Sequence, residues 1–384
     1  MILGNNVASK MLSYSDKLSS FDFGPGHPFL PARAKQLMDL LSRYSLVYEE
    51  DQQIVAPRPL DEDLLYLFHT EKYIELLKKA ELGEISAEML EAGLGTEDCP
   101  IVRGMFDFCL TASGGTHQGA LMLLRDEVQV VFNPVGGFHH AGSANAEGFC
   151  YVNDLAIAIA DLARKGKRVA YIDIDVHYGN GVRDAFHESA DVLTVSIHES
   201  GATLYPWSGF PDDIGDGKGR GYNANIPLLQ GSDDEVFLYA FESIVPPLVA
   251  AFKPDIVVAE IGADTHRDDP LGHLNLTSNG YEQAVRMIKE MSPKILATGG
   301  GGYNLYKTAA LWTLAWATLC GLEPHDAFAG LIGGMMYGPE AQSGTLRDDP
   351  YAVTGALKDQ CLGNAREVVG YLRKNLFPLH GIRA

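Results

Sequence analysis

The sequence predicts an α/β protein of three layers, in which a mainly parallel central sheet is flanked by helices. Short runs rich in β-branched residues alternate along the chain with longer stretches that can form helices, as in strand–helix–strand units. Several short runs are apolar throughout, which is typical of strands buried on both faces of a parallel sheet. No internal repeat, low-complexity tract or linker rich in Ser or Pro interrupts this alternation, so we expect a single domain over residues 1–384.

The expected elements follow in chain order. The strands are residues 127–132 (EVQVVF), 168–175 (RVAYIDID), 191–198 (DVLTVSIH), 254–261 (PDIVVAEI) and 293–298 (PKILAT). The longer segments between and after them are expected to be helices, namely residues 151–165, 233–252, 278–290 and 305–320. Residues 60–80 and 102–125 are expected to form further helices outside the repeating units.

The composition limits the class of protein. Of the 384 residues, 46% are hydrophobic and 21% are charged, which is enough for a large core and excludes a disordered chain. The 30 Lys and Arg residues against 50 Asp and Glu residues give a net charge of −20. A surface this acidic repels phosphate backbones, so we expect no nucleic-acid partner, and it mildly favours cationic substrates.

The cysteines and the chain start bear on the compartment. No run of about 18 apolar residues is present, so we expect no membrane span. The start, MILGNNVASK, lacks the basic and then apolar order of a secretory signal. The cysteines are widely scattered without a C-x-x-C motif, which indicates reduced core residues in a cytoplasmic protein. They are Cys99, Cys109, Cys150, Cys320 and Cys361.

Polar residues gather directly after four of the expected strands. NPVGGFHHAG follows the first, DIDVHYGNG ends the second, EIGADTHRDDP ends the fourth and TGGGGYN ends the fifth. Parallel sheets bind ligands at the carboxyl ends of their strands. The sequence therefore predicts a functional site built from these four strand ends.

The motif D-x-D-x-H predicts a metal site. In an extended strand Asp173, Asp175 and His177 share one face, and the apolar residues between them fill the other. Unpaired buried carboxylates are very costly, and a divalent cation would compensate them. A third ligand should come from a neighbouring strand end, and Asp264, which follows the fourth expected strand, is the candidate. Two Asp and one His would leave a coordination position open, as a catalytic zinc site requires.

Paired histidines and a glycine run complete the candidate site. We expect the side chains of His139 and His140 to point in nearly opposite directions, which makes joint ligation of one ion awkward and favours acid/base work. The glycines of residues 299–302 allow a tight backbone that could aim the hydroxyl of Tyr303 into the site as an oxyanion donor.

Together these motifs resemble the zinc-dependent histone deacetylase superfamily with its arginase–deacetylase fold. The resemblance is strongest to class I-like bacterial members such as acetoin-utilisation proteins. It runs from the segment GHPFLPAR, which starts at Gly26, to about Cys320. The motifs that carry it, in chain order, are HH, GFC-x-x-ND, D-x-D-x-H, GAD and GGGGY.

The resemblance implies two kinds of metal. Asp175, His177 and Asp264 would bind zinc, with iron(II) as an alternative ion. The family also binds potassium, and many of those ligands are backbone carbonyls. The matching inner-site positions are Asp173, Asp175, His177, Ser196 and Ile197. The matching outer-site positions are Phe186, Ser189, Val192 and Tyr222.

It also implies the catalytic residues. His140 resembles the general base that activates the water, and His139 resembles its partner imidazole, oriented by Asp173. Tyr303 resembles the hydroxyl that polarises the amide carbonyl and stabilises the oxyanion. The partner of His140 is Asn180, where many class I members have Asp and other branches have Asn.

The substrate tunnel is assigned in the same way. Phe149 and Tyr205 resemble its aromatic walls, with Leu271 lower on the rim. The backbone carbonyl of Gly148 would accept the substrate amide N–H, and Asp98 resembles the rim aspartate that binds the substrate backbone. Arg33 resembles the arginine of the internal cavity through which acetate leaves. The sequence departs from the family in having Tyr178 after His177 and in the loop of residues 199–221.

The leading hypothesis is a zinc-dependent amidohydrolase that removes acetyl or another short acyl group from a lysine ε-amine. A deacetylase of small cationic amides such as acetylpolyamines would use the same tunnel motifs. An arginase-like enzyme with two manganese ions would need further carboxylate ligands. A binding module for acyl-lysine is the non-enzyme alternative, against which the retained Tyr303, paired histidines and three metal ligands argue.

Overall fold

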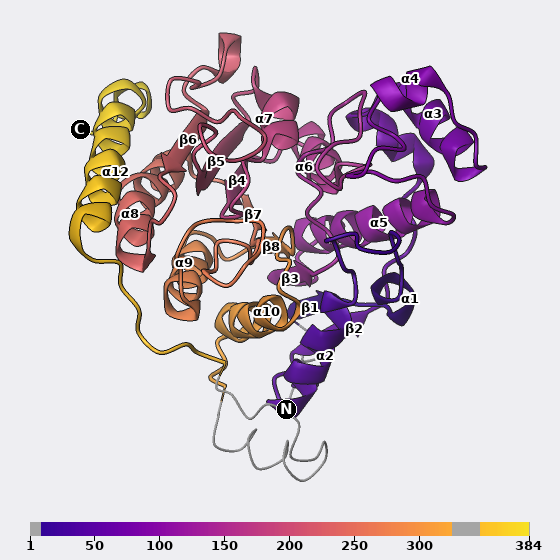
Figure 1. Cartoon of the computed structure of the whole chain (residues 1–384), viewed down its shortest axis with the longest axis horizontal. Helices are drawn as coiled ribbons and strands as arrows, with labels where there is room; N and C mark the ends of the chain where they lie inside the picture. Colours follow the sequence, from indigo (N-terminus) through magenta and orange to yellow (C-terminus); the bar gives the residue numbers. More distant parts are fainter. Residues whose placement is uncertain (1–8, 325–345, 384) are drawn as a thin grey trace, which may run out of the picture.

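The computed structural model describes residues 9–324 and 346–383, and within them the strands form one eight-stranded sheet in which every pairing is parallel (Figure 1). The strand order is β2-β1-β3-β8-β7-β4-β5-β6. This confirms the predicted α/β architecture. The strands are β1 (Lys10–Ser13), β2 (Gln52–Val55), β3 (Val130–Asn133), β4 (Val169–Asp173), β5 (Val192–Glu199), β6 (Asn223–Leu228), β7 (Ile256–Glu260) and β8 (Ile295–Thr298).

Helices cover both faces of the sheet. Apolar residues of α2, α8, α9, α10 and α12 pack with one face, and those of α5, α6 and α7 pack with the other (Figure 1). The α-helices are α1 (Asp16–Ser19), α2 (Arg33–Arg43), α3 (Glu71–Glu81), α4 (Ala87–Glu91), α5 (Met105–Leu124), α6 (Asp154–Arg164), α7 (Asn180–Phe186), α8 (Asp234–Phe252), α9 (Ser278–Glu290), α10 (Leu305–Cys320) and α12 (Gly355–Asn375). The 3₁₀ helices are η1 (Glu62–Leu67), η2 (Gly217–Gly219) and η3 (Phe377–His380).

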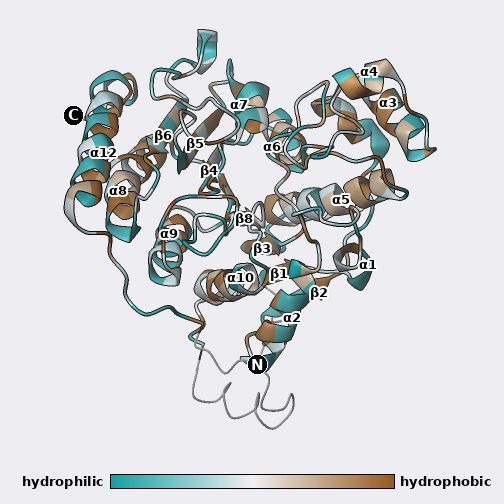
Figure 2. Ribbon diagram, viewed as in Figure 1, coloured by the Kyte–Doolittle hydropathy of each residue, from teal (hydrophilic) through white to brown (hydrophobic). Residues whose placement is uncertain are grey.

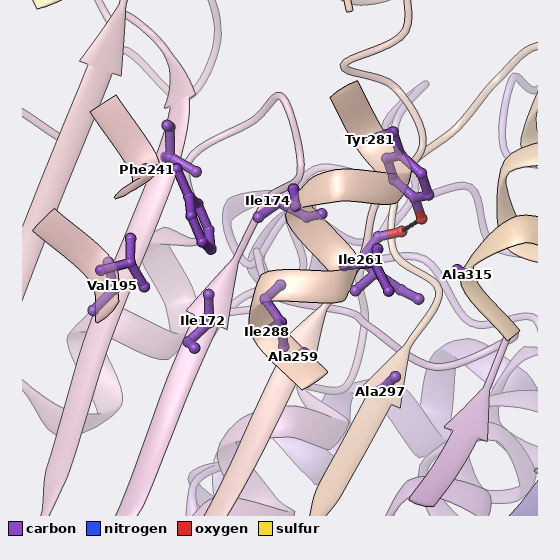
Figure 3. Packing of buried hydrophobic residues seen from close by; sticks show 14 of the residues in the cluster. Ile172, Ile174, Val195, Phe241, Ala259, Ile261, Tyr281, Ile288, Ala297 and Ala315 are labelled. Carbon is purple, nitrogen blue, oxygen red and sulfur yellow. Dashed lines mark hydrogen bonds between the residues drawn. The ribbon is translucent and has the colours of Figure 1, made fainter. Parts of the chain in front are cut away.

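The core alternates across the sheet as the period of two requires. In β4, Tyr171 packs with the α5–α7 layer, whereas Ile172 packs with the α8–α10 layer. Figure 3 shows Ile172 and its neighbour Ala259 beneath side chains of α8 and α9, including Phe241 and Ile288. Each fully buried side chain of this size stabilises the fold by roughly 1.5–3 kcal/mol. In Figure 2, α9 and α12 show both colours, as expected for helices with one face on the core.

Three strands were not predicted, and each is weak as a sequence signal. β1 and β2 have only four residues each, and β2 is a partly buried edge strand that begins with two glutamines. β6 reads NANIPL, with residues of low strand propensity, and Pro227 is tolerated because β6 is the other edge strand.

The helix predicted over residues 60–80 is wrong as one element. The chain forms η1 and then α3, which are separated by Phe68, His69 and Thr70. Thr70 has an extended backbone, and its side chain accepts a hydrogen bond from the Tyr73 N–H, so it starts a new helix instead of continuing the first.

Other expectations are met unevenly. All the cysteines are free and buried, as predicted for core residues. By length and composition alone, α8 could cross a membrane, which the sequence reading did not anticipate, although half of its most apolar stretch is buried inside the molecule. It packs against β5, β6, α9 and α12, as a core helix does. Residues 1–8, where no signal peptide is expected, lie outside the described residues.

Candidate active site

The four motif-bearing strand ends are neighbours in the middle of the sheet. They belong to β3, β8, β7 and β4, which are consecutive in the strand order. Because all four strands run parallel, their carboxyl ends and the loops that follow lie at one edge of the sheet. The HH, GGGGY, GAD and D-x-D-x-H segments therefore converge, as the sequence predicts.

Asp175, His177 and Asp264 converge in a buried cluster. One ligand atom from each lies within 4.8 Å of the others. His177 Nδ1 is 3.2 Å from Asp175 Oδ1 and 3.0 Å from Asp264 Oδ2. The two carboxylates have no exposed surface, and His177 is 7% exposed.

Backbone amides hold the two carboxylates in this arrangement. The N–H of His177 donates to Asp175 Oδ1 over 2.9 Å, and that of Gly301 donates to Asp175 Oδ2 over 2.6 Å. The N–H of Val176 donates to Asp264 Oδ1 over 2.8 Å. The loops after three different strands thus orient the cluster before any ligand binds.

The electrostatics of the cluster favour a cation. Burial raises the pKa of Asp264, and the charge of Asp175 raises it further, to about 8. Burial alone would lower the pKa of His177, but hydrogen bonds to Asp175 and Asp264 and their charges outweigh it and raise the pKa to about 10. Imidazole nitrogens and carboxylate oxygens are both ligands that zinc binds in proteins, and three protein ligands leave a position open for water. The residues therefore fit a zinc ion.

The two histidines form a relay beside this cluster. His139 Nδ1 lies 2.9 Å from Asp173 Oδ2, and His139 Nε2 lies 3.1 Å from His140 Nε2. His140 Nδ1 lies 2.7 Å from Asn180 Oδ1. The expectation that the two side chains point apart is wrong, because residues 139 and 140 lie in a turn and not in an extended strand, and their ring centroids are 4.1 Å apart.

The relay histidines differ in basicity. Burial lowers the pKa of His140 well below its ordinary value, and the neighbouring His139 and His177 lower it further. Burial opposes protonation of His139 as well, but the charges of Asp173 and Asp175 outweigh burial and raise its pKa. His140 is therefore suited to stay neutral and to accept a proton, as a general base must.

A pocket of about 300 Å³ leads from the surface to this edge of the sheet. The rings of Phe149 and Tyr303 meet edge to face with their centroids 5.7 Å apart, and the centroid of Tyr205 lies 5.1 Å from that of His140. The lining residues are Asp98, His140, Gly148, Phe149, His177, Leu204, Tyr205, Trp207, Leu271 and Tyr303. The residues predicted for the tunnel and its rim are among them, namely Asp98, Gly148, Phe149, Tyr205 and Leu271.

Arg33 lies behind the glycine loop, and the acetate-exit cavity assigned to it stays a prediction. It is 2% exposed, and its guanidinium donates to the carbonyls of Gly300 and Gly302 over 2.8 and 2.7 Å. Its guanidinium carbon lies 4.4 Å from the ring centroid of Phe29 and 4.8 Å from that of Trp312. Arg33 therefore supports the backbone that precedes Tyr303.

The predicted potassium positions lie along β4, β5 and α7. Asp173 at the end of β4 pairs in register with Ser196 of β5. The second set surrounds the end of α7 and the start of β5, where the Ser189 N–H donates to the Phe186 carbonyl, and Tyr222 lies just before β6. Potassium binding at both places stays a prediction.

The sequence reading missed several carboxylates that hold the site together. Asp154 accepts the N–H groups of Gly137 and Phe138, which fixes the loop before the histidines. Asp269 accepts the N–H of Tyr303 over 2.7 Å. Both stand in quoted motifs, Asp154 in GFC-x-x-ND and Asp269 in EIGADTHRDDP, which was the available signal.

Glu260 was also missed, although an acidic residue inside an apolar strand was a visible signal. It is fully buried at the end of β7, and burial together with Asp173 and Asp175 raises its pKa well above the ordinary value. His139, Asp175 and Glu260 form a second group with ligand atoms within 4.8 Å of one another.

The chain is similar in sequence to known proteins that carry one shared domain. A family model described as "Histone deacetylase domain" matches residues 27–319. Histone deacetylase B of Dictyostelium discoideum is 36% identical over 344 residues, which cover 89% of this chain and 81% of that protein. Histone deacetylase 1 of Homo sapiens is 36% identical over 313 residues, which cover 81% of this chain and 64% of that protein. The chain thus spans just under two thirds of the human relative.

Solved structures agree. A crystal structure of an HDAC homolog from Aquifex aeolicus matches with a TM-score of 0.81 and 31% identity, covering 93% of this chain and 99% of that chain. A crystal structure of an HDAC homolog complexed with SAHA matches with a TM-score of 0.81 and 32% identity over the same shares. The protein belongs to the histone deacetylase family. It has the arginase–deacetylase fold and is a deacetylase, as the sequence motifs predicted.

Proposed function

We propose that the protein hydrolyses an acyl group, foremost acetyl, from a lysine ε-amine in a zinc-dependent reaction. The observation that carries this proposal is the convergence of Asp175, His177 and Asp264 beside the pocket that His140 and Tyr303 line. The printed names of the relatives support it, because they describe histone deacetylases.

Zinc, with iron(II) as an alternative, would be held by Asp175, His177 and Asp264. When bound, such an ion supplies Lewis acidity and lowers the pKa of water towards about 7. The chain's own residues orient the reacting groups. The acyl-lysine stem would lie between the rings of Phe149 and Tyr205, in a pocket whose lining is largely apolar.

His140 would move the proton. Its Nε2 accepts the proton from water as the water oxygen bonds to the acyl carbon. The carbon–nitrogen bond of the amide then breaks, and the same proton passes to the lysine nitrogen as it leaves. His139, held by Asp173 over 2.9 Å, keeps the imidazole pair aligned during both transfers.

Tyr303 would stabilise the oxyanion. Burial and the charges of Asp264 and Asp175 raise the pKa of its hydroxyl well above the ordinary value, so the group stays an O–H donor. Such a donor can hydrogen-bond to the carbonyl oxygen as negative charge develops on it. The carboxylate of Asp269 accepts the Tyr303 N–H over 2.7 Å, which fixes the backbone position from which the Tyr303 side chain extends.

A substrate panel on protein loaded with a defined metal tests the proposal. We expect hydrolysis of an acetyl-lysine peptide that depends on zinc or iron(II). Comparing acetyl, propionyl, butyryl, lactyl and crotonyl lysine would define the acyl group. Acetylputrescine in the same assay tests the alternative of small cationic amides. No hydrolysis of any acyl-lysine by metal-loaded protein would refute the proposal.

A further inference from the structure

Glu147 lies in the loop between the paired histidines and Phe149, and its carboxylate collects three hydrogen-bond donors. The hydroxyl of Tyr205 donates to Oε1 over 2.6 Å, and the Asn180 Nδ2 group donates to the same atom over 3.4 Å. The Asn145 Nδ2 group donates to Oε2 over 3.1 Å. Glu147 does not line the pocket, so it acts on the site only through these neighbours.

The orientation of the Asn180 amide determines which nitrogen of His140 carries a proton. With Oδ1 facing His140 Nδ1, as observed at 2.7 Å, Nδ1 must be the N–H donor, and Nε2 keeps its lone pair when the ring is neutral. If the amide turned over, its Nδ2 group would donate to Nδ1, and the proton would then sit on Nε2. A neutral His140 with Nε2 protonated could not accept a proton there.

A carboxylate decides between these two orientations because it accepts hydrogen bonds and donates none. In the observed orientation Asn180 Nδ2 faces Glu147 Oε1. In the reversed orientation the amide oxygen would face the carboxylate oxygen, which is repulsive. The Tyr205 hydroxyl donates to the same Oε1 atom and helps to hold it in place. Burial and the hydrogen bond to Glu147 raise the pKa of this hydroxyl, so it stays protonated and remains a donor.

We propose that Glu147 is a positioning residue that holds the Asn180 amide and thereby keeps the proton of His140 on Nδ1, so that the unprotonated Nε2, which lies 3.1 Å from His139 Nε2, can act as the base. This inference rests on the proposed hydrolysis with His140 as base. It assigns a role to an acidic residue that no family motif quoted above contains.

The loop itself does not need the Glu147 side chain. The backbone of Glu147 and Cys150 exchanges two hydrogen bonds of 3.0 and 2.9 Å, and the N–H of Ala146 donates to the carbonyl of Ala92 over 2.8 Å. Removing the Glu147 side chain therefore leaves these contacts in place, and the variant Glu147→Ala is expected to fold.

The kinetic test uses Glu147→Ala, Asn180→Asp and the double variant. Because Glu147→Ala removes a charged acceptor that holds the Asn180 amide, it should lower kcat by at least roughly tenfold while KM changes by less than about twofold. The carboxylate introduced by Asn180→Asp only accepts hydrogen bonds, so it keeps the proton on Nδ1 without help from Glu147, and the double variant should recover most of the lost kcat. In the presence of Glu147, the same Asn180→Asp change should give no gain, because two carboxylates would face each other.

Asn145→Ala is the matched control, because it removes a donor to Glu147 Oε2 without touching Asn180. It should leave kcat at the wild-type level. A Glu147→Ala enzyme with wild-type kcat, or one that Asn180→Asp fails to rescue, would overturn the role of Glu147.

A second readout does not depend on turnover. Long-range ¹H–¹⁵N spectra, with the His140 signals assigned by their loss in His140→Gln, should show a protonated Nδ1 in the wild type and a mixture of tautomers in Glu147→Ala. Unchanged His140 signals in Glu147→Ala would overturn the proposal even if the wild type hydrolyses acyl-lysine. If the signals change but the wild type is inactive, the role of Glu147 in setting the tautomer of His140 is supported, and the proposed function is refuted.

Discussion

The partner of His140 is a neutral amide, and this choice sets the pH range in which His140 can act as a base. Burial and the neighbouring His139 and His177 lower the pKa of His140, whereas a carboxylate at position 180 would raise it. A base is active when deprotonated, so activity is lost as the pH falls through its pKa. We therefore expect the acidic limb of kcat/KM for Asn180→Asp to lie at higher pH than that of the wild type. Coincident acidic limbs, each scaled to its own plateau, would argue against this.

Tyr303 is expected to act on the transition state and not on metal binding. The change Tyr303→Phe removes only the hydroxyl, and loss of one oxyanion donor costs about 10²–10³ in kcat. Tyr306→Phe is the control, because Tyr306 lies three residues away on α10 and is 71% exposed. We expect Tyr303→Phe to retain its zinc and to lose turnover of an acetyl-lysine peptide. An acyl-lysine binding module would keep peptide affinity in both variants and hydrolyse the peptide in neither.

Among the secondary-structure elements, five interior strands were predictable, whereas the short interior strand β1 and the edge strands β2 and β6 were not. The runs that became β3, β4, β5, β7 and β8 are apolar because helices cover both of their faces, and this pattern is visible in the sequence. The edge strands β2 and β6 have weaker patterns because fewer neighbours constrain them. The location of the site was predictable as well, because its motifs follow four strands whose carboxyl ends lie at one edge of the sheet.

The supporting residues were harder to predict because their partners are distant in sequence. Asp269 contacts Tyr303 from 34 residues away, and Glu147 contacts Asn180 and Tyr205 from 33 and 58 residues away. No local periodicity encodes such loop-to-loop contacts. The turn that brings His139 and His140 together is likewise a loop property, and the extended geometry assumed for them was wrong.

The strand β4, which leads into the metal-binding motif, should also be a main source of stability. Ile172 in β4 is fully buried beneath α8 and α9 (Figure 3). The change Ile172→Ala leaves a cavity that its neighbours fill only in part, so we expect the free energy of unfolding to fall by about 2–5 kcal/mol. Leu82→Ala is the control, because Leu82 is 80% exposed and its loss should change stability by less than about 0.5 kcal/mol. Equal denaturation midpoints for the two variants would contradict this packing account.

For the whole chain, the net charge of −20 should influence the KM of charged peptide substrates. Long-range attraction favours cationic ligands and is screened by salt over a Debye length of about 10 Å at 0.1 M. We expect an acetyl-lysine peptide with Arg and Lys flanks to have a lower KM than one with Asp and Glu flanks at low salt, with the difference shrinking as salt is added. A KM ratio that does not respond to salt would exclude this electrostatic contribution.

The central claim is that a divalent ion held jointly by Asp175, His177 and Asp264 is required for hydrolysis. The most direct measurement compares zinc content and acetyl-lysine turnover in the wild type and in Asp264→Asn, a change that preserves the side-chain shape and its capacity to accept the Val176 N–H. We predict about one zinc per wild-type chain, with both zinc and turnover lost together in the variant, since removing a protein ligand weakens zinc binding. A variant that keeps both its zinc and its turnover would contradict the account.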